Sequence, residues 1–243
     1  MRLTYPHMGE AYIAVKSLMD DIGVESVIPA FTTSSTLRLG SSLSPEAVCM
    51  PYKIMLGNYI NSIKAGADTI LITGSCGPCR FGYYGPLQKQ ALWEAGYKDT
   101  DMIILDPPRE GYQKFLEALK KVAGKNSGRI IPSFINAYKV CCELDSMNEL
   151  LYYIRPRAFN KAELRRIMHE FKNDVMAVKG SGQMLELIHD TKNRIRGIDI
   201  DKSFKPLKIG IIGEIYTIIE PFSNLHTEER LGDLGAEVHR SMT

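Results

Sequence analysis

The segment 66–79 reads GADTILITGSCGPC and decides the fold. Residues 69–73 are a continuous run of β-branched and aliphatic side chains, which predicts a short buried strand. The glycine-rich stretch that follows predicts a loop. The sequence therefore places Cys76 and Cys79 on a loop at the carboxyl end of a buried strand.

Strands and helices are predicted to alternate on both sides of this segment. Pro51 suits the first turn of a helix that continues to Gly66, with apolar residues at helical spacing. The other predicted elements are strand 3–5, helix 12–22, strand 24–30, helix 87–95, strand 102–105 and helix 111–122. This alternation predicts an α/β fold with a Rossmann-like parallel sheet.

The second half of the chain predicts two further parts. We expect residues 1–135 to form the α/β domain, 136–205 a helical insertion or bridge, and 206–243 the truncated start of a second, similar α/β domain. The last part offers only two strands and one helix, which cannot bury a sheet alone. We therefore expect the chain to be completed by a missing C-terminal part or by another subunit. Cys141 and Cys142 lie in the helical part and are expected to be small buried core residues.

Composition excludes several classes of partner. The 243 residues carry 30 basic and 28 acidic side chains, and no long run of like charge suggests a nucleic-acid or membrane surface. No apolar stretch approaches the roughly 20 residues of a membrane helix, and the first residues lack the apolar core of a signal peptide. We therefore expect a cytoplasmic protein. Five cysteines in such a chain favour metal binding or thiol chemistry over disulfides.

Three cysteines occupy positions typical of metal ligands. Cys76 and Cys79 follow the buried strand, and Cys49 immediately precedes a predicted helix whose positive end favours a thiolate. Arg80 and Lys53 could offset the negative charge of a bound cluster. The loop glycines, among them Gly74, Gly77, Gly82 and Gly85, are expected to let backbone amides approach it.

Several motifs together resemble the 2-hydroxyacyl-CoA dehydratase family, and in particular its branch associated with activator ATPases. The similar segments are 5–9 (YPHMG), 44–53 (SPEAVCMPYK), 57–60 (GNYI), 66–69 (GADT), 77–85 (GPCRFGYYG) and 213–216 (GEIY), with Glu220, Pro221, Phe222 and Asn224. The resemblance covers most of the chain and is specific for the family rather than for a substrate.

The resemblance implies an iron–sulfur protein. It implies a 4Fe–4S or double-cubane cluster with Cys49, Cys76 and Cys79 as metal ligands, and it assigns no catalytic residue. It also implies a dehydratase (lyase) or small-molecule reductase system with an acyl-CoA or another small reducible substrate. The electron donor would be a separate activator ATPase, and the chain would belong to a homo- or hetero-oligomer.

Two residues are candidates for the surroundings of the cluster. Arg80 directly follows Cys79. His7 follows the first predicted strand and could face the same site, although a local capping or core role explains it equally well.

Other functions remain open at the level of sequence. Residues 75–80 (SCGPCR) match the core motif of thioredoxin, so a thiol–disulfide oxidoreductase using Cys76 and Cys79 is the main alternative. Against it, Gly82, Gly85 and Pro86 are expected to interrupt the helix that should follow such a motif. A zinc site with His7 as the fourth ligand and a non-catalytic iron–sulfur carrier are further alternatives.

Overall fold

The computed structural model describes residues 1–74, 79–105 and 112–240. The chain divides into two compact units, of which unit 1 comprises residues 1–7 and 18–134 and unit 2 comprises residues 8–17 and 135–243. Parallel strands and helices occur together in both units, so the predicted α/β class is confirmed.

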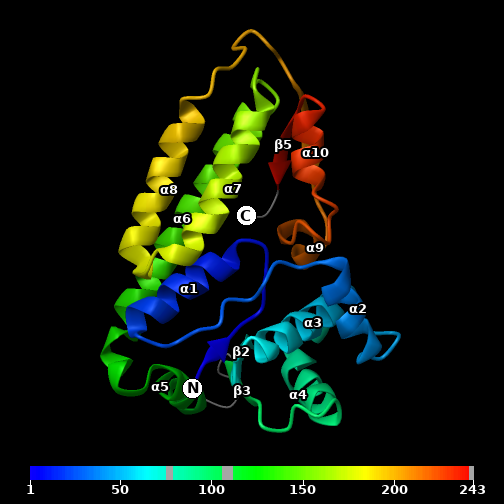
Figure 1. Cartoon of the computed structure of the whole chain (residues 1–243), viewed down its shortest axis with the longest axis vertical. Coiled ribbons are helices and arrows are strands. Elements are labelled where there is room, and N and C mark those ends of the chain that lie inside the picture. The colour runs from blue at the N-terminus through cyan, green and yellow to red at the C-terminus, as the bar shows by residue number, and fades with distance from the viewer. Residues whose placement is uncertain (75–78, 106–111, 241–243) are drawn as a thin grey trace. The chain divides into compact units, whose positions relative to one another are not determined.

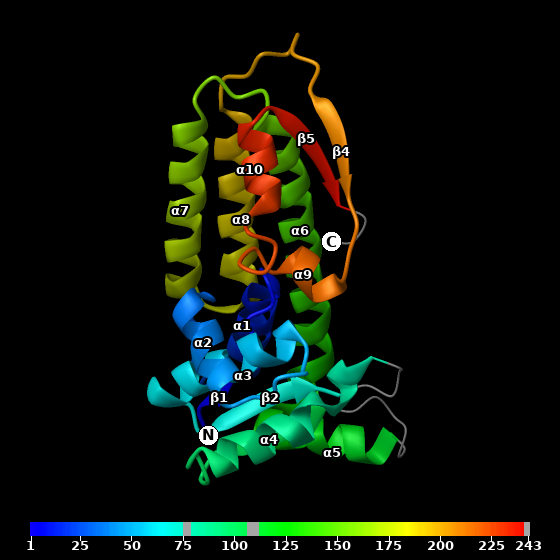
Figure 2. The ribbon, with the colours of Figure 1, turned by 90° about the vertical axis from the view of Figure 1, so that its right-hand side faces the viewer.

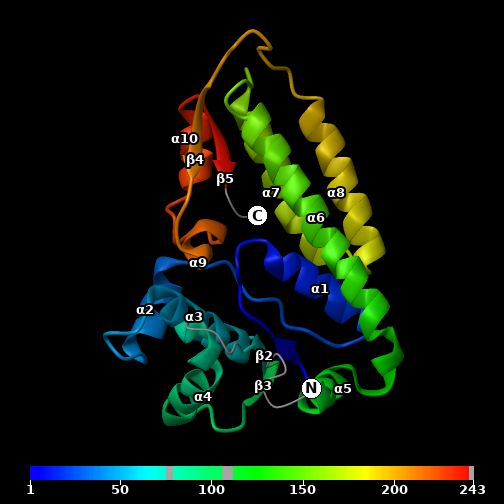
Figure 3. The same cartoon turned by 180° about the vertical axis from the view of Figure 1, so that it is seen from behind.

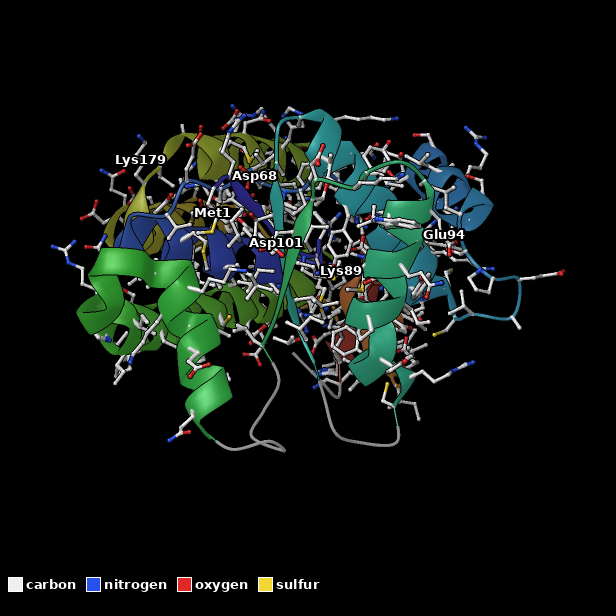
Figure 4. The ribbon with its side chains drawn as sticks, turned by 90° about the horizontal axis from the view of Figure 1, so that it is seen from below. Met1, Asp68, Lys89, Glu94, Asp101 and Lys179 are labelled. Carbon is white, nitrogen blue, oxygen red and sulfur yellow. The ribbon has the colours of Figure 1, made fainter. Side chains whose placement is uncertain are left out.

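Unit 1 is built on a three-stranded parallel sheet in the order β1-β2-β3. Helices α4 and α5 lie on opposite sides of β2 and β3, and Asp68 and Asp101 mark the beginnings of these two strands (Figure 4). The elements of the unit are β1 (Leu3–Thr4), the end of α1 (Ala11–Ile22), α2 (Ser34–Ser42), α3 (Met50–Lys64), β2 (Thr69–Thr73), the 3₁₀ turn η1 (Arg80–Tyr83), α4 (Tyr84–Glu94), β3 (Asp101–Leu105), α5 (Tyr112–Ala123) and the 3₁₀ turn η2 (Gly124–Arg129).

The central strand β2 is buried, as its composition predicts. Ile70, Leu71 and Ile72 are inaccessible to solvent or nearly so, which is typical of a parallel strand covered on both faces. On one face α4 approaches the sheet closely at Gly85, where an added Cβ would lie 2.7 Å from Ile104 Cδ1. The missing side chain of Gly85 therefore allows close helix-to-sheet packing.

The predicted strand 24–30 is mostly absent. Only Ser26 pairs with the sheet, as an isolated parallel bridge to Leu3. The backbone amide of Leu3 donates to Glu25 O and that of Val27 donates to Leu3 O, over 2.9 Å and 2.8 Å. Pro29 has no N–H to continue the ladder, which explains why so apolar a segment forms so little strand.

Helix α2, which the sequence did not predict, packs closely against α3. Thr33 caps α2 with a reciprocal pair of hydrogen bonds to Thr36. The two helix backbones approach at Gly40 and Gly57. This crossing fixes the first half of α3, the helix that begins next to Cys49.

Unit 2 contains three long helices that run side by side (Figures 1 and 3). The side chains of Phe171, Met184 and Ile188 are fully buried in it, and Lys192 Nζ of α8 lies 2.8 Å from Glu143 Oε2 of α6. The elements are α6 (Ile130–Ile154, mostly in this unit), α7 (Lys161–Ala177), α8 (Gly180–Arg196), β4 (Leu207–Ile211), α9 (Ile215–Ile219), α10 (Thr227–Asp233) and β5 (Ala236–Arg240).

Strands β4 and β5 form a two-stranded parallel sheet (Figure 2), so the two strands predicted within residues 206–243 are confirmed. Between them Glu214 caps α9, accepting hydrogen bonds from the backbone amides of Tyr216 and Thr217. A carboxylate at this position stabilises the positive end of the helix.

The two adjacent cysteines of α6 are not core residues. Cys141 is half-buried and Cys142 is exposed, so their expected burial is wrong. Neighbouring positions on a helix point about 100° apart, and only one of the two can face inward.

In the described part of the chain, no helix is long and apolar enough to cross a membrane.

Unit 2 also contains a half-buried acid, Glu10. Its Oε2 accepts a hydrogen bond of 2.8 Å from Asn148 Nδ2. Burial raises the pKa of Glu10 above its ordinary value, and the opposing effects of the Asn148 hydrogen bond and of the Lys172 and Arg240 charges are smaller.

We expect Glu10→Gln to stabilise the protein at pH 8 and to have no such effect at pH 4. The raised pKa means that the folded state holds the proton more tightly, so this contribution to stability is present below the ordinary glutamate pKa and is lost as the pH rises through the folded pKa. Urea unfolding followed by circular dichroism at both pH values tests this, with the exposed Glu186→Gln as the control. A stabilisation that is equal at both pH values would contradict it.

Candidate metal centre

The candidate site lies at the carboxyl edge of the sheet in unit 1. Because α3 precedes β2 and α4 follows it, the amino ends of both helices lie at the edge where β2 ends. Ligand sites of parallel sheets occur at this edge. Cys49 is the N-cap residue of α3, and Cys79 is the N-cap residue of η1, the turn that leads into α4.

Cys49 is joined to the other cysteine segment through a tyrosine. Its Sγ lies 2.5 Å from the hydroxyl oxygen of Tyr84, the first residue of α4. When Cys49 is a thiolate, the tyrosine hydroxyl donates this hydrogen bond. Cys49 is half-buried and has no cap hydrogen bond to its own helix, so its sulfur is available as a ligand.

The charges of Cys79 and Arg80 affect the pKa of the same tyrosine. Burial raises the pKa of Tyr84 well above its ordinary value, and the hydrogen bond to Cys49 raises it further. The negative charges of the Cys49 and Cys79 thiolates add to this rise, whereas Arg80 opposes it. The structure thus brings three of the predicted site residues into one electrostatic environment around Tyr84.

Tyr84 is held in place by aromatic packing. Its ring meets that of Tyr52 edge-on at 5.2 Å between centroids, and that of Phe81 at 5.3 Å. Gln88, one turn further along α4, is buried and donates a hydrogen bond of 3.2 Å to the backbone carbonyl of Tyr52. This link between α3 and α4 was missed by the sequence reasoning, although Gln88 lies four residues after Tyr84, on the same helix face.

The other residues predicted for the site differ in their burial and contacts. Cys76 lies outside the described residues. His7 follows β1 and is buried, with its ring edge-on to Phe31 at 5.4 Å between centroids. Lys53 Nζ donates to the carbonyl oxygen of Glu46 over 3.0 Å, so it braces the loop before Cys49. Arg80 and Cys79 are exposed.

The expected interruption of the helix after the cysteine motif is found in part. The 3₁₀ turn η1 separates Cys79 from α4, and Tyr83 between them has non-helical dihedral angles. Pro86 falls in the first turn of α4, where its missing N–H costs no intrahelical hydrogen bond. Pro86 therefore does not argue against a thiol–disulfide function, whereas the late start of α4 still does.

The donor set around Tyr84 fits an iron–sulfur cluster in its chemistry. Two sulfurs come from separate segments at the carboxyl edge, and thiolates are the usual ligands of such clusters. The amino end of α3 and the Arg80 side chain supply positive charge. Among the residues described, which leave out Cys76, no group of three or more histidine, cysteine or acidic side chains is close enough to hold a metal ion.

The fold and the site define an α/β domain with two cysteines near one tyrosine at the carboxyl edge of its parallel sheet. No protein-family model, no curated protein and no solved structure matches this chain.

We expect Tyr84→Phe to destabilise unit 1 by about 1 kcal/mol, the usual net contribution of a hydrogen bond. The substitution removes the hydroxyl that contacts Cys49 and leaves the ring packing intact. Tyr83→Phe is the matched control because that neighbouring ring is exposed. Urea unfolding followed by the fluorescence of Trp93, the single tryptophan and a residue of unit 1, measures both. Equal stability of the two variants would contradict the role given to Tyr84.

Proposed function

We propose that this protein holds an iron–sulfur cluster on Cys49, Cys76 and Cys79 and accepts low-potential electrons in a system like the 2-hydroxyacyl-CoA dehydratases or the double-cubane reductases. The observation that carries the proposal is the contact of the Cys49 sulfur with the Tyr84 hydroxyl, together with the electrostatic effect of Cys79 on the same tyrosine. A bound cluster would supply one-electron transfer at low potential.

The protein residues have distinct tasks in this proposal. Tyr84 holds the Cys49 side chain and covers it from within the domain, because its ring is buried and its hydroxyl contacts the sulfur. The half-buried Cys49 and the exposed Cys79 leave the site open on one side. That exposure suits an electron donor that docks from outside, and we propose a separate activator ATPase in that role.

The substrate and the assembly belong to the same proposal. An acyl-CoA or another small reducible molecule would be the substrate, and the chain would work as part of a homo- or hetero-oligomer in the cytoplasm. A carrier that passes electrons on without transforming a substrate would use the same ligands. His7, buried after β1 at the same edge of the sheet, would border the site.

A thiol–disulfide oxidoreductase is the second candidate. It is favoured by the exposure of Cys79 and by the helical turn η1 that begins directly after it. In that function Cys49 would be dispensable, because the reaction needs only Cys76 and Cys79. The two candidates therefore differ in what they require of Cys49.

Electronic absorption and electron paramagnetic resonance of the anaerobically purified protein distinguish them. A cluster gives a broad visible absorption that bleaches on one-electron reduction, together with a paramagnetic signal. A colourless protein that reduces insulin disulfides, and does so equally well as Cys49→Ala, would instead establish the thiol function. A coloured protein that accepts electrons but transforms neither an acyl-CoA nor another small substrate would identify a carrier.

A further inference from the structure

Unit 2 contains a cavity of about 520 Å³, partly open to solvent, that the proposed function does not use. It lies among α6, α7, α9, α10, β5 and the beginning of α1, and every residue lining it belongs to unit 2. A volume of this size is typical of a site for a small molecule.

The walls of the cavity are largely apolar. Long aliphatic side chains line it from three helices and from the segment before α1: Met8, Leu144, Leu151, Met168, Ile215 and Ile219. A ligand with an apolar body would displace water from this surface, which is favourable.

Two of the arginines at the cavity are held closely by acids of the chain. Arg155 Nη1 lies 3.0 Å from a Glu229 oxygen and 3.2 Å from an Asp233 oxygen. Arg165 lies 3.3 Å from Asp233 as well. These two side chains share an ion-pair network with Asp233 and are not available to bind a ligand strongly.

Arg240 differs from them. Its side chain is only 10% exposed, and Glu228, its nearest acid among the described residues, is 3.8 Å away. Glu228 already accepts a hydrogen bond of 3.2 Å from Asn224, and within the described residues the buried Nε of Arg240 has no hydrogen-bond acceptor. A buried guanidinium with unfilled hydrogen-bonding capacity is costly to the free protein and favours an anionic ligand.

The neighbouring acids restrict the charge of that ligand. Glu10, Asp145 and Glu228 line the same cavity as Arg240. A dianion such as a phosphate ester would be repelled by them more strongly than a monoanion. A carboxylate also matches the planar fork of a guanidinium.

We propose that this cavity binds a small carboxylic acid with an apolar body, whose carboxylate contacts Arg240 and whose hydrocarbon lies against Leu144, Leu151 and Ile215. The site is separate from the cysteines of unit 1 and stands whether or not they hold a cluster. Asn148, whose side chain also lines the cavity, is a further polar contact for the bound acid.

Two adjacent cysteines provide an internal test in the unmodified protein. Cys141 lines the cavity and is half-buried, whereas its neighbour Cys142 is exposed and does not line it. Sodium octanoate is the probe, and the alkylation of each cysteine by iodoacetamide is followed by tandem mass spectrometry. We expect octanoate to slow the alkylation of Cys141 at least threefold and to leave that of Cys142 unchanged.

Charge selectivity and one substitution complete the test. Titration calorimetry should show octanoate binding in a 1:1 ratio and at least tenfold more tightly than octylamine or octyl phosphate. Arg240→Gln should weaken binding about tenfold or more, and Arg196→Gln, which changes an exposed arginine of α8, should not. Equal protection of both cysteines, no binding of octanoate, or equal binding of octylamine or octyl phosphate would overturn the proposal even if Arg240→Gln fails to fold.

Discussion

Gly57→Ala should destabilise unit 1 by about 3 kcal/mol, a cost at the upper end for overpacking in a well-packed interior. An added Cβ at Gly57 would lie 2.1 Å from the carbonyl oxygen of Thr36, and one at Gly40 would lie 1.7 Å from that of Lys53. Both contacts are to backbone atoms, so neither can be relieved by rotating a side chain. Helices α2 and α3 would have to separate.

Urea unfolding monitored by the fluorescence of Trp93 measures this effect, because Trp93 and Gly57 both belong to unit 1. Gly128→Ala is the matched control, because Gly128 also lies in unit 1 and an added Cβ there meets no atom within 4 Å. The control should remain within about 0.5 kcal/mol of the parent, as for most surface substitutions. If Gly57→Ala unfolds at the same urea concentration as the control, the close crossing of α2 and α3 is wrong.

Cys49→Ala should lose most of the iron and acid-labile sulfide and the visible absorption that accompanies them. The substitution removes one of the proposed thiolate ligands and the group to which the Tyr84 hydroxyl is hydrogen-bonded. Cys79→Ala should have the same effect, because it removes another of the proposed thiolate ligands. Iron and sulfide per chain, measured after anaerobic purification, test both variants.

Cys142→Ala is the control for these variants, since Cys142 is exposed on α6 in unit 2. Circular dichroism excludes unfolding as the cause of a loss. Variants of Cys49 and Cys79 that are folded and retain as much iron and sulfide as Cys142→Ala would show that these cysteines are not ligands.

The sheet of unit 1 could be predicted because its sequence signals are local. Strand β2 is a continuous aliphatic run, and the helices on either side end near glycines with positive φ, Gly66 and Gly96. The pairing of α2 with α3 could not be predicted in the same way. It depends on Gly40 and Gly57 meeting backbone atoms of the other helix, and the residues of α2 are poor helix formers that leave only the capping pair Thr33 and Thr36 as a signal.

The candidate site could also be predicted only in part. Cys49, Cys79 and Arg80 could be selected because their residue types and loop positions suggest metal chemistry. The central place of Tyr84 could not be predicted, because it results from two helix ends that meet across the edge of a sheet. Arg240 carries no local signal either, since its importance arises from burial and from the distance to Glu228.

Iron, acid-labile sulfide and zinc per chain in the anaerobically purified parent protein test the central claim most directly. The cluster account predicts iron and sulfide in comparable amounts and no stoichiometric zinc. Protein free of iron and sulfide under these conditions, whether it carries zinc instead or holds no metal and has a redox-active Cys76–Cys79 pair, would contradict it.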